Sequence, residues 1–248
     1  MNMAHEEFTR IVEGSDTAVL MVHGICGTPN HFREFMPLVP TDWSVHALLL
    51  PGHGGTVEDF ARSSLPQWRN HVFARLEELL ATHGRVFIAA HSMGTLFAIQ
   101  ASVKYPGRIA GLFLLGSPTR PFVAPYAAVN AVKLQFSVVD PADKSAVDMR
   151  DGCSVDGDPR LWKYVTWIPR FLELFREIAH TQPLLGQIPA RTMVFQSRKD
   201  ELVHPSSYAD FLGFERIEPH MLEDSGHFGY GEADLALLKR KFLELIQN

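Results

Sequence analysis

Cysteine is scarce in this chain, and its scarcity excludes two classes of protein. Only Cys26 and Cys153 occur among 248 residues. Small domains held by disulfides and cysteine-rich zinc modules both need more thiols than that. The 12 histidines are scattered, without the close spacing to cysteine or carboxylate residues that a metal site requires. We therefore expect a fold stabilised by a hydrophobic core, with no metal centre.

Positive charge is not in excess either. Lysine and arginine number 23 against 28 aspartate and glutamate residues, which leaves a formal net charge of −5. Proteins that bind nucleic acid need a positive surface to meet the phosphates, so we expect no nucleic-acid partner. No run of residues approaches the ~20 apolar residues of a membrane span. The segment Met1–Glu7 is polar and acidic, unlike a secretory signal, and we expect a cytoplasmic location.

Apolar residues make up 46% of the chain, and they follow a regular order. Short apolar runs alternate with longer segments in which apolar residues recur at three- and four-residue steps, as in 68–80 and 235–246. Continuous apolar runs are typical of strands covered on both faces. This alternation predicts an α/β fold, a mainly parallel sheet with helices on both faces. The predicted strands are 18–22, 45–50, 86–90, 112–115, 193–195 and 217–222.

The interval 118–189 interrupts this alternation. It contains no convincing buried strand, and half of the 16 prolines lie in it. Because an insertion of this length is usually functional, we predict a small helical cap over a site, with the core formed by 1–117 and 190–248. The alternative is a peripheral helical elaboration that makes no contact with substrate.

The strongest local motif is centred on Ser92. An apolar strand leads directly into His91-Ser92-Met93-Gly94, and a helical pattern follows at once. This strand–turn–helix setting is typical of a nucleophilic serine in the motif G-x-S-x-G. A turn this sharp needs small neighbours and holds the serine in a strained backbone conformation, at a cost of about 1–3 kcal/mol. Here Gly94 is kept and Ala90 replaces the first glycine, so the motif alone is a weak signal.

A second motif lies upstream, where a strand ends in the pentapeptide His-Gly-Ile-Cys-Gly at 23–27. With both motifs, the chain resembles the α/β-hydrolase family, and within it the small carboxylesterases and monoacylglycerol lipases. The resemblance covers nearly the whole chain. It implies an oxyanion hole formed by two backbone N–H groups, those of Ile25 and Met93. It also implies that His53, in the loop Leu50–Gly54, supports the oxyanion loop without doing chemistry.

Two further residues complete a candidate catalytic triad. Asp200 follows a predicted strand end, where its side chain can point into the site, whereas we interpret Glu201 beside it as a solvated loop acid. His227 lies after the last predicted strand and before the last helix, where the family places its histidine. Ser92, Asp200 and His227 follow the chain order of the triad in this fold. We therefore predict Ser92 as the nucleophile, His227 as the base and Asp200 as the acid that orients it.

The predicted activity is hydrolysis of a small-molecule carboxylic ester, with a short- to medium-chain acyl group or as a monoacylglycerol, through an acyl-enzyme. Trp162, Trp167 and Phe171 of the cap are expected to help form the acyl pocket, because such pockets are mostly apolar. The triad requires no metal and no organic cofactor. We interpret Cys26 as a packing residue, since no second histidine is placed to activate it.

Other reactions of the same fold stay open. They are hydrolysis of a thioester, an amide or peptide, or a carbon–carbon bond, and acyl transfer to an alcohol. A non-catalytic ligand-binding relative is a further alternative, which the presence of all three triad residues disfavours. A serine at position 92 excludes the aspartate nucleophile of haloalkane- and epoxide-type hydrolases. The sequence leaves the oligomeric state open.

Overall fold

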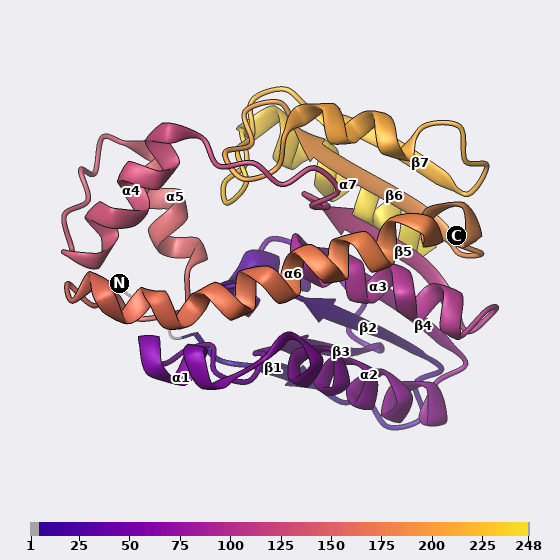
Figure 1. The fold of residues 1–248 in the computed structure, drawn as a ribbon. Helices are drawn as coiled ribbons and strands as arrows, with labels where there is room; N and C mark the ends of the chain where they lie inside the picture. Colours follow the sequence, from indigo (N-terminus) through magenta and orange to yellow (C-terminus); the bar gives the residue numbers. More distant parts are fainter. Residues whose placement is uncertain (1–4, 248) are drawn as a thin grey trace.

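A computed structural model of the protein describes residues 5–247 (Figure 1). Within them, seven strands form one sheet in the order β1-β3-β2-β4-β5-β6-β7. β1 is antiparallel to β3, and the other neighbouring strands are parallel. Residues 1–4, which belong to the segment expected to lack a secretory signal, and residue 248 lie outside this part of the chain. The strands are β1 (Phe8–Arg10), β2 (Thr17–Val22), β3 (Ser44–Leu48), β4 (Arg85–His91), β5 (Ile109–Leu115), β6 (Arg191–Ser197) and β7 (Ile217–Leu222).

Each predicted apolar run overlaps one of the strands β2 to β7, and the predicted α/β fold is confirmed. All six residues of β2 are buried because both faces of the sheet are covered. Alternate side chains point to opposite faces, so Leu20 joins the apolar cluster on one face and Met21 the cluster on the other. β1 was not predicted, because its residues are exposed or half-buried at the edge of the sheet and form no apolar run.

Helices cover both faces of this sheet (Figure 1). α2, α3 and α6 contribute to the apolar cluster on one face, and α7 contributes to the other together with the 3₁₀ helix η1. Within residues 5–247, no helix is long and apolar enough to span a bilayer, and the expected cytoplasmic location stays a prediction. The helices of the core are η1 (Pro29–Phe32), η2 (Met36–Leu38), α1 (Val57–Arg62), α2 (Leu65–Thr82), α3 (Met93–Lys104), η5 (Pro205–Phe211) and α7 (Glu232–Gln247).

Five helices lie between β5 and β6, in the interval predicted as a cap: α4 (Pro125–Gln135), α5 (Lys144–Gly152), η3 (Leu161–Trp167), α6 (Ile168–Thr181) and η4 (Gln182–Gln187). In Figure 1, α4 and α5 lie together at one end of the molecule, and α6 runs from that end across to α3. Leu174 and Ile178 of α6 are buried in the same apolar cluster as α3. Only the first part of the interval therefore stands apart from the core, and the division at 118–189 stays a prediction.

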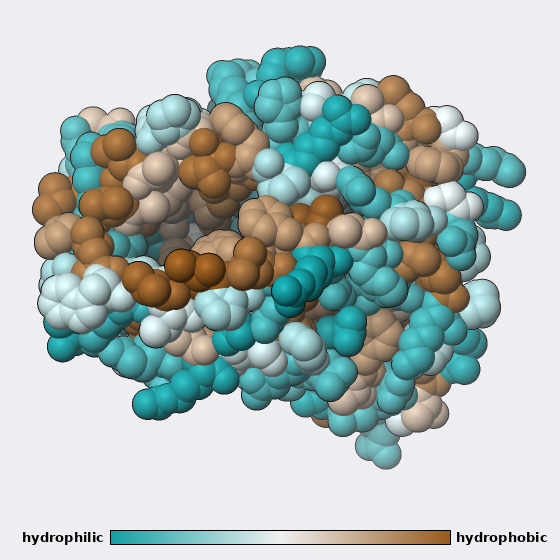
Figure 2. All heavy atoms as spheres, viewed as in Figure 1, coloured by the Kyte–Doolittle hydropathy of each residue, from teal (hydrophilic) through white to brown (hydrophobic). Residues whose placement is uncertain are grey.

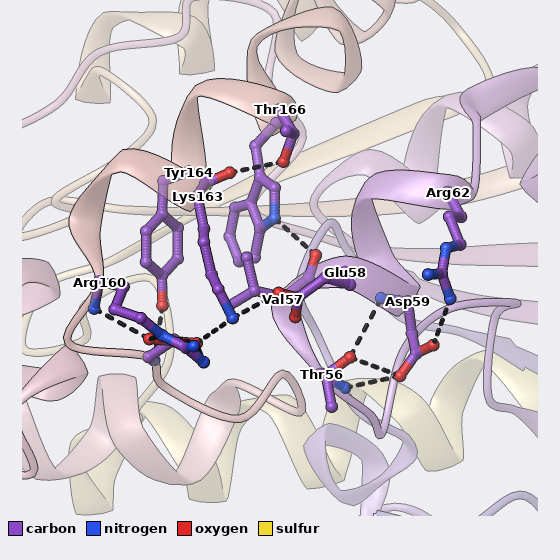
Figure 3. A network of polar contacts seen from close by, with 11 residues as sticks. Thr56, Val57, Glu58, Asp59, Arg62, Arg160, Lys163, Tyr164 and Thr166 are labelled. Atoms are coloured by element: carbon purple, nitrogen blue, oxygen red, sulfur yellow. Dashed lines mark hydrogen bonds and ion pairs between the residues drawn. The ribbon is translucent and has the colours of Figure 1, made fainter.

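Contacts between η3 and α1 fasten this interval to the core (Figure 3). The indole N–H of Trp167 donates to the carbonyl oxygen of Val57 at 3.1 Å, and its ring lies 4.4 Å from that of Phe60. Lys163 of η3 forms ion pairs with Asp158 at 2.6 Å and with Glu58 of α1. η3 is therefore held against α1 by a contact between the buried ring of Phe60 and the half-buried ring of Trp167, and by a partly exposed charge network.

Candidate active site

Ser92 occupies the tight turn between β4 and α3. Its backbone has φ 49° and ψ −123°, and residues other than glycine rarely adopt a positive φ. The turn is fixed from the neighbouring strand, because the Ser92 N–H donates to the carbonyl oxygen of Leu115 at 2.8 Å. The residue is 7% exposed. This strained, enclosed turn is the geometry predicted for a nucleophilic serine.

The small residues around Ser92 are needed because main chains approach closely. A Cβ atom on Gly94 would lie 2.3 Å from the carbonyl oxygen of Val22, so α3 could not cross the end of β2 with a larger residue there. A Cβ atom on Gly24 would lie 2.7 Å from that of Ser92. The loop after β2 therefore touches the serine directly. Ala90, in place of the first glycine of the motif, is fully buried in the core.

The two predicted oxyanion donors lie on either side of this contact. Met93 is the first residue of α3, whose N-terminus carries unpaired N–H groups and a partial positive charge. Ile25 lies next to Gly24 in the loop after β2. Neither N–H group donates to a backbone or side-chain acceptor within residues 5–247. Both are free to bind an anion, and their catalytic role stays a prediction.

His23, not His53, holds this loop by hydrogen bonds. Its Nε2 accepts from the N–H of Leu50 at 3.0 Å, and its Nδ1 therefore carries the proton that it donates to the carbonyl oxygen of Gly24 at 2.8 Å. Burial lowers the pKa of His23 to about 4, so the ring is neutral at pH 7. His53 packs its ring 4.8 Å from that of His23. The supporting role expected for His53 is thus indirect, through contact with His23.

Asp200 and His227, predicted from chain order, lie in hydrogen-bond contact. Nδ1 of His227 and Oδ2 of Asp200 are 2.9 Å apart, and both side chains are at most 3% exposed. The other carboxylate oxygen of Asp200 accepts from the N–H groups of Leu202 at 2.8 Å and Val203 at 2.7 Å. These bonds fix the carboxylate at the end of β6. The carboxylate in turn fixes the orientation of the imidazole ring.

Ser92 lies near His227, but no hydrogen bond joins Ser92 to the imidazole. A Cβ atom on Gly116, the residue after β5, would lie 3.3 Å from Cε1 of His227, and Leu115 before it accepts from Ser92. Both His227 and Ser92 thus adjoin the end of β5. Nε2 of His227 and Oγ of Ser92 are not hydrogen-bonded to each other. Such bonds are often long in unliganded enzymes and shorten when substrate binds.

Charges around His227 set its protonation. Burial lowers its pKa, but the nearby carboxylates of Asp200 and Glu201 raise it, and the net effect is a raised pKa. The interpretation of Glu201 as a solvated acid is wrong. Glu201 is 3% exposed and accepts a hydrogen bond from the main-chain N–H of His227 at 2.7 Å. A single acidic residue in a loop carries no local signal of burial, which here comes from residues 26 positions away.

Two histidines that are not among the predicted site residues pack beside His227. The ring of His91 lies 3.6 Å from that of His31 and 4.7 Å from that of His227. Nε2 of His91 donates to the carbonyl oxygen of His227 at 3.0 Å, and Nε2 of His31 bonds to the hydroxyl of Tyr230 at 2.7 Å. Burial lowers the pKa of His31 to about 3 and that of His91 well below its usual value. These neutral rings pack against His227 and its loop without adding charge.

The other predicted site residues differ in their surroundings. Trp167 anchors η3 to α1, whereas Trp162 is 70% exposed and Phe171 is 39% exposed. Substrate contact by these three stays a prediction. Burial raises the pKa of the Cys26 thiol well above its usual value, which supports its interpretation as a packing residue. Within residues 5–247, no three histidine, cysteine or carboxylate side chains converge to hold a metal ion.

Residues 19–239 match the alpha/beta hydrolase family. This chain belongs to that family. Among curated relatives, the thermostable monoacylglycerol lipase of Bacillus sp. (strain H-257) is 24% identical over 94% of this chain and 91% of its own length. The 2-hydroxy-6-oxo-6-phenylhexa-2,4-dienoate hydrolase of Comamonas testosteroni is 25% identical over 88% and 84%. An acetyltransferase component of the acetoin cleaving system of Pseudomonas putida is 32% identical, over only 41% of this chain and 27% of that protein.

Solved structures give the same fold. One of the metagenome-derived lipolytic enzymes LipS and LipT has a TM-score of 0.74 at 22% identity, covering 99% of this hydrolase and 98% of that chain. The meta-cleavage product hydrolase CumD of Pseudomonas fluorescens IP01 has a TM-score of 0.65 at 19% identity, covering 97% and 94%. Lipolytic enzymes and meta-cleavage product hydrolases thus share the architecture of this chain, and the choice between their substrates depends on the site.

Proposed function

We propose that this hydrolase cleaves carboxylic esters, with short- to medium-chain acyl groups or as monoacylglycerols, through a triad of Ser92, His227 and Asp200. The observation that carries the proposal is the buried bond between Asp200 and His227, formed beside the strained turn of Ser92. A buried imidazole with a carboxylate on Nδ1 presents Nε2 as a base. The serine hydroxyl at the neighbouring turn is the group that such a base activates.

The reaction follows from these positions. Oγ of Ser92 attacks the ester carbonyl carbon while Nε2 of His227 takes the hydroxyl proton, and the tetrahedral oxyanion is held by the N–H groups of Ile25 and Met93. Collapse breaks the bond to the alcohol, which leaves with the proton from His227. Water then attacks the acyl-enzyme with His227 as base, and the acid is released. Two fixed donors are each worth about 3–4 kcal/mol of transition-state stabilisation.

The surface of the predicted cap supports an apolar substrate. Figure 2 shows hydrophobic residues gathered around a hollow enclosed by α4, α5 and α6. A soluble protein leaves few large apolar patches exposed unless they bind something. The exposed large hydrophobic residues of the interval 118–189 are Phe122, Val123, Tyr126, Val129, Val132, Phe136, Val138, Leu161, Trp162, Val165, Ile168, Phe171, Leu172 and Phe175.

The test combines labelling with a substrate panel. A fluorophosphonate probe should add its mass to the peptide that contains Ser92, and Ser92→Ala should remove both the label and the hydrolysis of p-nitrophenyl esters. Specificity for esters should rise with acyl length from acetate upward, because each buried methylene contributes about 0.8 kcal/mol. A labelled Ser92 with no ester turnover at any length would overturn the ester assignment and keep the nucleophile.

A second candidate comes from the similarity to the Comamonas testosteroni and Pseudomonas fluorescens hydrolases. The same triad could act on a substrate of the kind that these enzymes are named for. Incubation with 2-hydroxy-6-oxo-6-phenylhexa-2,4-dienoate, followed by its absorbance, separates the two. Turnover of that compound that exceeds turnover of the best ester in the panel would favour the second candidate.

A further inference from the structure

Glu201 is a buried carboxylate that lies between the loop of His227 and the predicted cap. Its Oε2 accepts from the main-chain N–H of His227 at 2.7 Å, and its Oε1 accepts from the hydroxyl of Ser145 in α5 at 3.4 Å. It forms no ion pair with a lysine, arginine or histidine within residues 5–247. Burial raises the pKa of the Glu201 carboxyl, because a buried charge without a cationic partner is costly.

Gly226, the residue before His227, lies close to the carboxylate of Glu201. A Cβ atom on Gly226 would lie 2.7 Å from Oε2 of Glu201. Gly226 has no positive φ, so its backbone conformation is open to other residues and the constraint is the contact alone. The loop thus approaches Glu201 as closely as a glycine permits, which brings the N–H of His227 onto the carboxylate.

We propose that Glu201 is a positioning residue for the triad: its carboxylate holds the main chain of His227, while Asp200 holds the ring. Two neighbouring residues of one loop, Asp200 and Glu201, then fix the ring and the main chain of the same histidine. The inference rests on the proposed function, since it assigns Glu201 a role in placing the catalytic base. Glu201 touches no reacting atom, and it acts only through His227.

The charge of Glu201 adds a second effect that a purely structural contact would lack. An ionised carboxylate beside an imidazole favours the protonated ring, so removal of this charge should lower the pKa of His227. The other titratable groups around His227 keep their positions in such a variant. They are Asp200 on the same loop as Glu201, His91 of β4, His31 of η1, Tyr230 of its own loop, and Asp148 of α5, which lies against Gly229.

Three variants separate position from charge. Glu201→Gln keeps an oxygen for the N–H of His227 and can turn its amide N–H₂ toward Ser145, so the histidine stays in place without the charge. Glu201→Ala removes the acceptor as well. Glu223→Gln is the matched control, because Glu223 lies on the same loop as His227 but is 61% exposed in an ion pair with Arg198.

We expect kcat on the best ester to fall by about tenfold to a hundredfold in Glu201→Ala with KM little changed, since a displaced base affects the chemical step. Glu201→Gln should restore kcat to within a few fold. Its acid limb of kcat/KM should move to lower pH, whereas that of Glu223→Gln should not move. A Glu201→Gln profile that coincides with that of Glu223→Gln, or moves to higher pH, would overturn the electrostatic part. Wild-type kcat in folded Glu201→Ala would overturn the positioning role.

One measurement does not depend on ester turnover. The ring of His227, labelled with ¹³C at Cε1 and assigned by comparison with His227→Gln, can be titrated by NMR in wild type and in Glu201→Gln. A lower midpoint in Glu201→Gln supports the proposal even if the substrate is not an ester, and an unchanged midpoint contradicts it. If Glu201→Ala does not fold, this titration and the pH profile of Glu201→Gln still decide the question.

Discussion

Ser92 combines the hydroxyl proposed as the nucleophile with a backbone conformation that favours glycine. With φ at 49°, a residue bearing a Cβ atom is strained there, by about 1–3 kcal/mol. The strain persists because the turn is fixed on both sides, by the bond from Ser92 N–H to Leu115 and by the close approach of Gly94 to Val22. The side chain of Ser92 makes no capping hydrogen bond to α3, so its hydroxyl is not engaged by the helix that it precedes.

Replacing Ser92 by glycine should therefore stabilise the protein while it abolishes activity. Relief of strain is partly offset by the greater chain entropy of unfolded glycine, about 0.5–1 kcal/mol. We expect Ser92→Gly to exceed Ser92→Ala in free energy of unfolding by about 1 kcal/mol. Urea denaturation of the two variants, both inactive, measures the difference. A Ser92→Gly variant that is less stable than Ser92→Ala would mean that the turn holds no strain.

Among single residues, those of the proposed triad have clearer sequence signals than the residues packed around them. Ser92, Asp200 and His227 each follow a predicted strand, and the ends of parallel strands meet at one edge of the sheet. The burial of Glu201 is not predictable from its neighbours in sequence, because it depends on the loop around Gly226. The contacts of His23 are not predictable from its motif either, since its acceptor and donor partners come together only in the folded loop.

Elements with one consistent pattern were the most predictable. β2 is apolar throughout because both its faces are covered, and its strand assignment needs no tertiary information. β1 has three exposed or half-buried residues, and its pairing with β3 depends on a free sheet edge. The position of α6 is only partly predictable from its sequence. Its aromatic residues indicate a cap, whereas Leu174 and Ile178 on the same helix belong to the core.

The segment η3 offers a test of what its aromatic residues do. Trp167 packs on Phe60 and donates to Val57, while Trp162 is 70% exposed. Trp167→Ala should lower the free energy of unfolding by about 2–3 kcal/mol, less than for a fully buried tryptophan. Trp162→Ala should change it by less than about 0.5 kcal/mol.

Acyl-chain profiles distinguish anchoring from substrate contact in the same two variants. If Trp162 contacts the acyl chain, Trp162→Ala should lower kcat/KM for long-chain esters and leave short-chain esters unchanged. Trp167→Ala should affect all chain lengths alike, through the position of η3. A Trp162→Ala profile parallel to wild type at every length would remove Trp162 from the predicted pocket.

At the scale of the whole molecule, the protein folds around several histidines that are buried and neutral. Burial lowers the pKa of His23 to about 4 and that of His31 to about 3, and it lowers those of His53 and His91 well below their usual value. In the unfolded chain each has a pKa of about 6.5. Acid therefore favours the unfolded state, which binds protons that the folded state excludes. The contribution of His227 to the pH dependence of stability has the opposite sign, because its pKa is raised in the folded protein.

Stability should therefore be greatest above about pH 6.5 and fall as the pH drops from there toward 4. For His23 alone, a pKa lowered to about 4 corresponds to about 3 kcal/mol across that range. The raised pKa of His227 makes a contribution that is complete below its unfolded value and lost as the pH rises through its folded value, so it offsets only part of this fall. Urea denaturation at pH 7.5, 6.5 and 5.5 should show a decreasing midpoint with an unchanged slope.

The variant His53→Phe tests whether buried histidines cause the loss of stability at low pH. His53 packs against the rings of Phe60 and Trp68, and its Nε2 is buried without a hydrogen-bond partner among residues 5–247. Phenylalanine fills similar space and cannot take up a proton, so the midpoint of this variant should depend less steeply on pH than that of wild type. Equal steepness in both proteins would mean that His53 does not contribute, and a pH-independent midpoint in wild type would contradict the account for all four histidines.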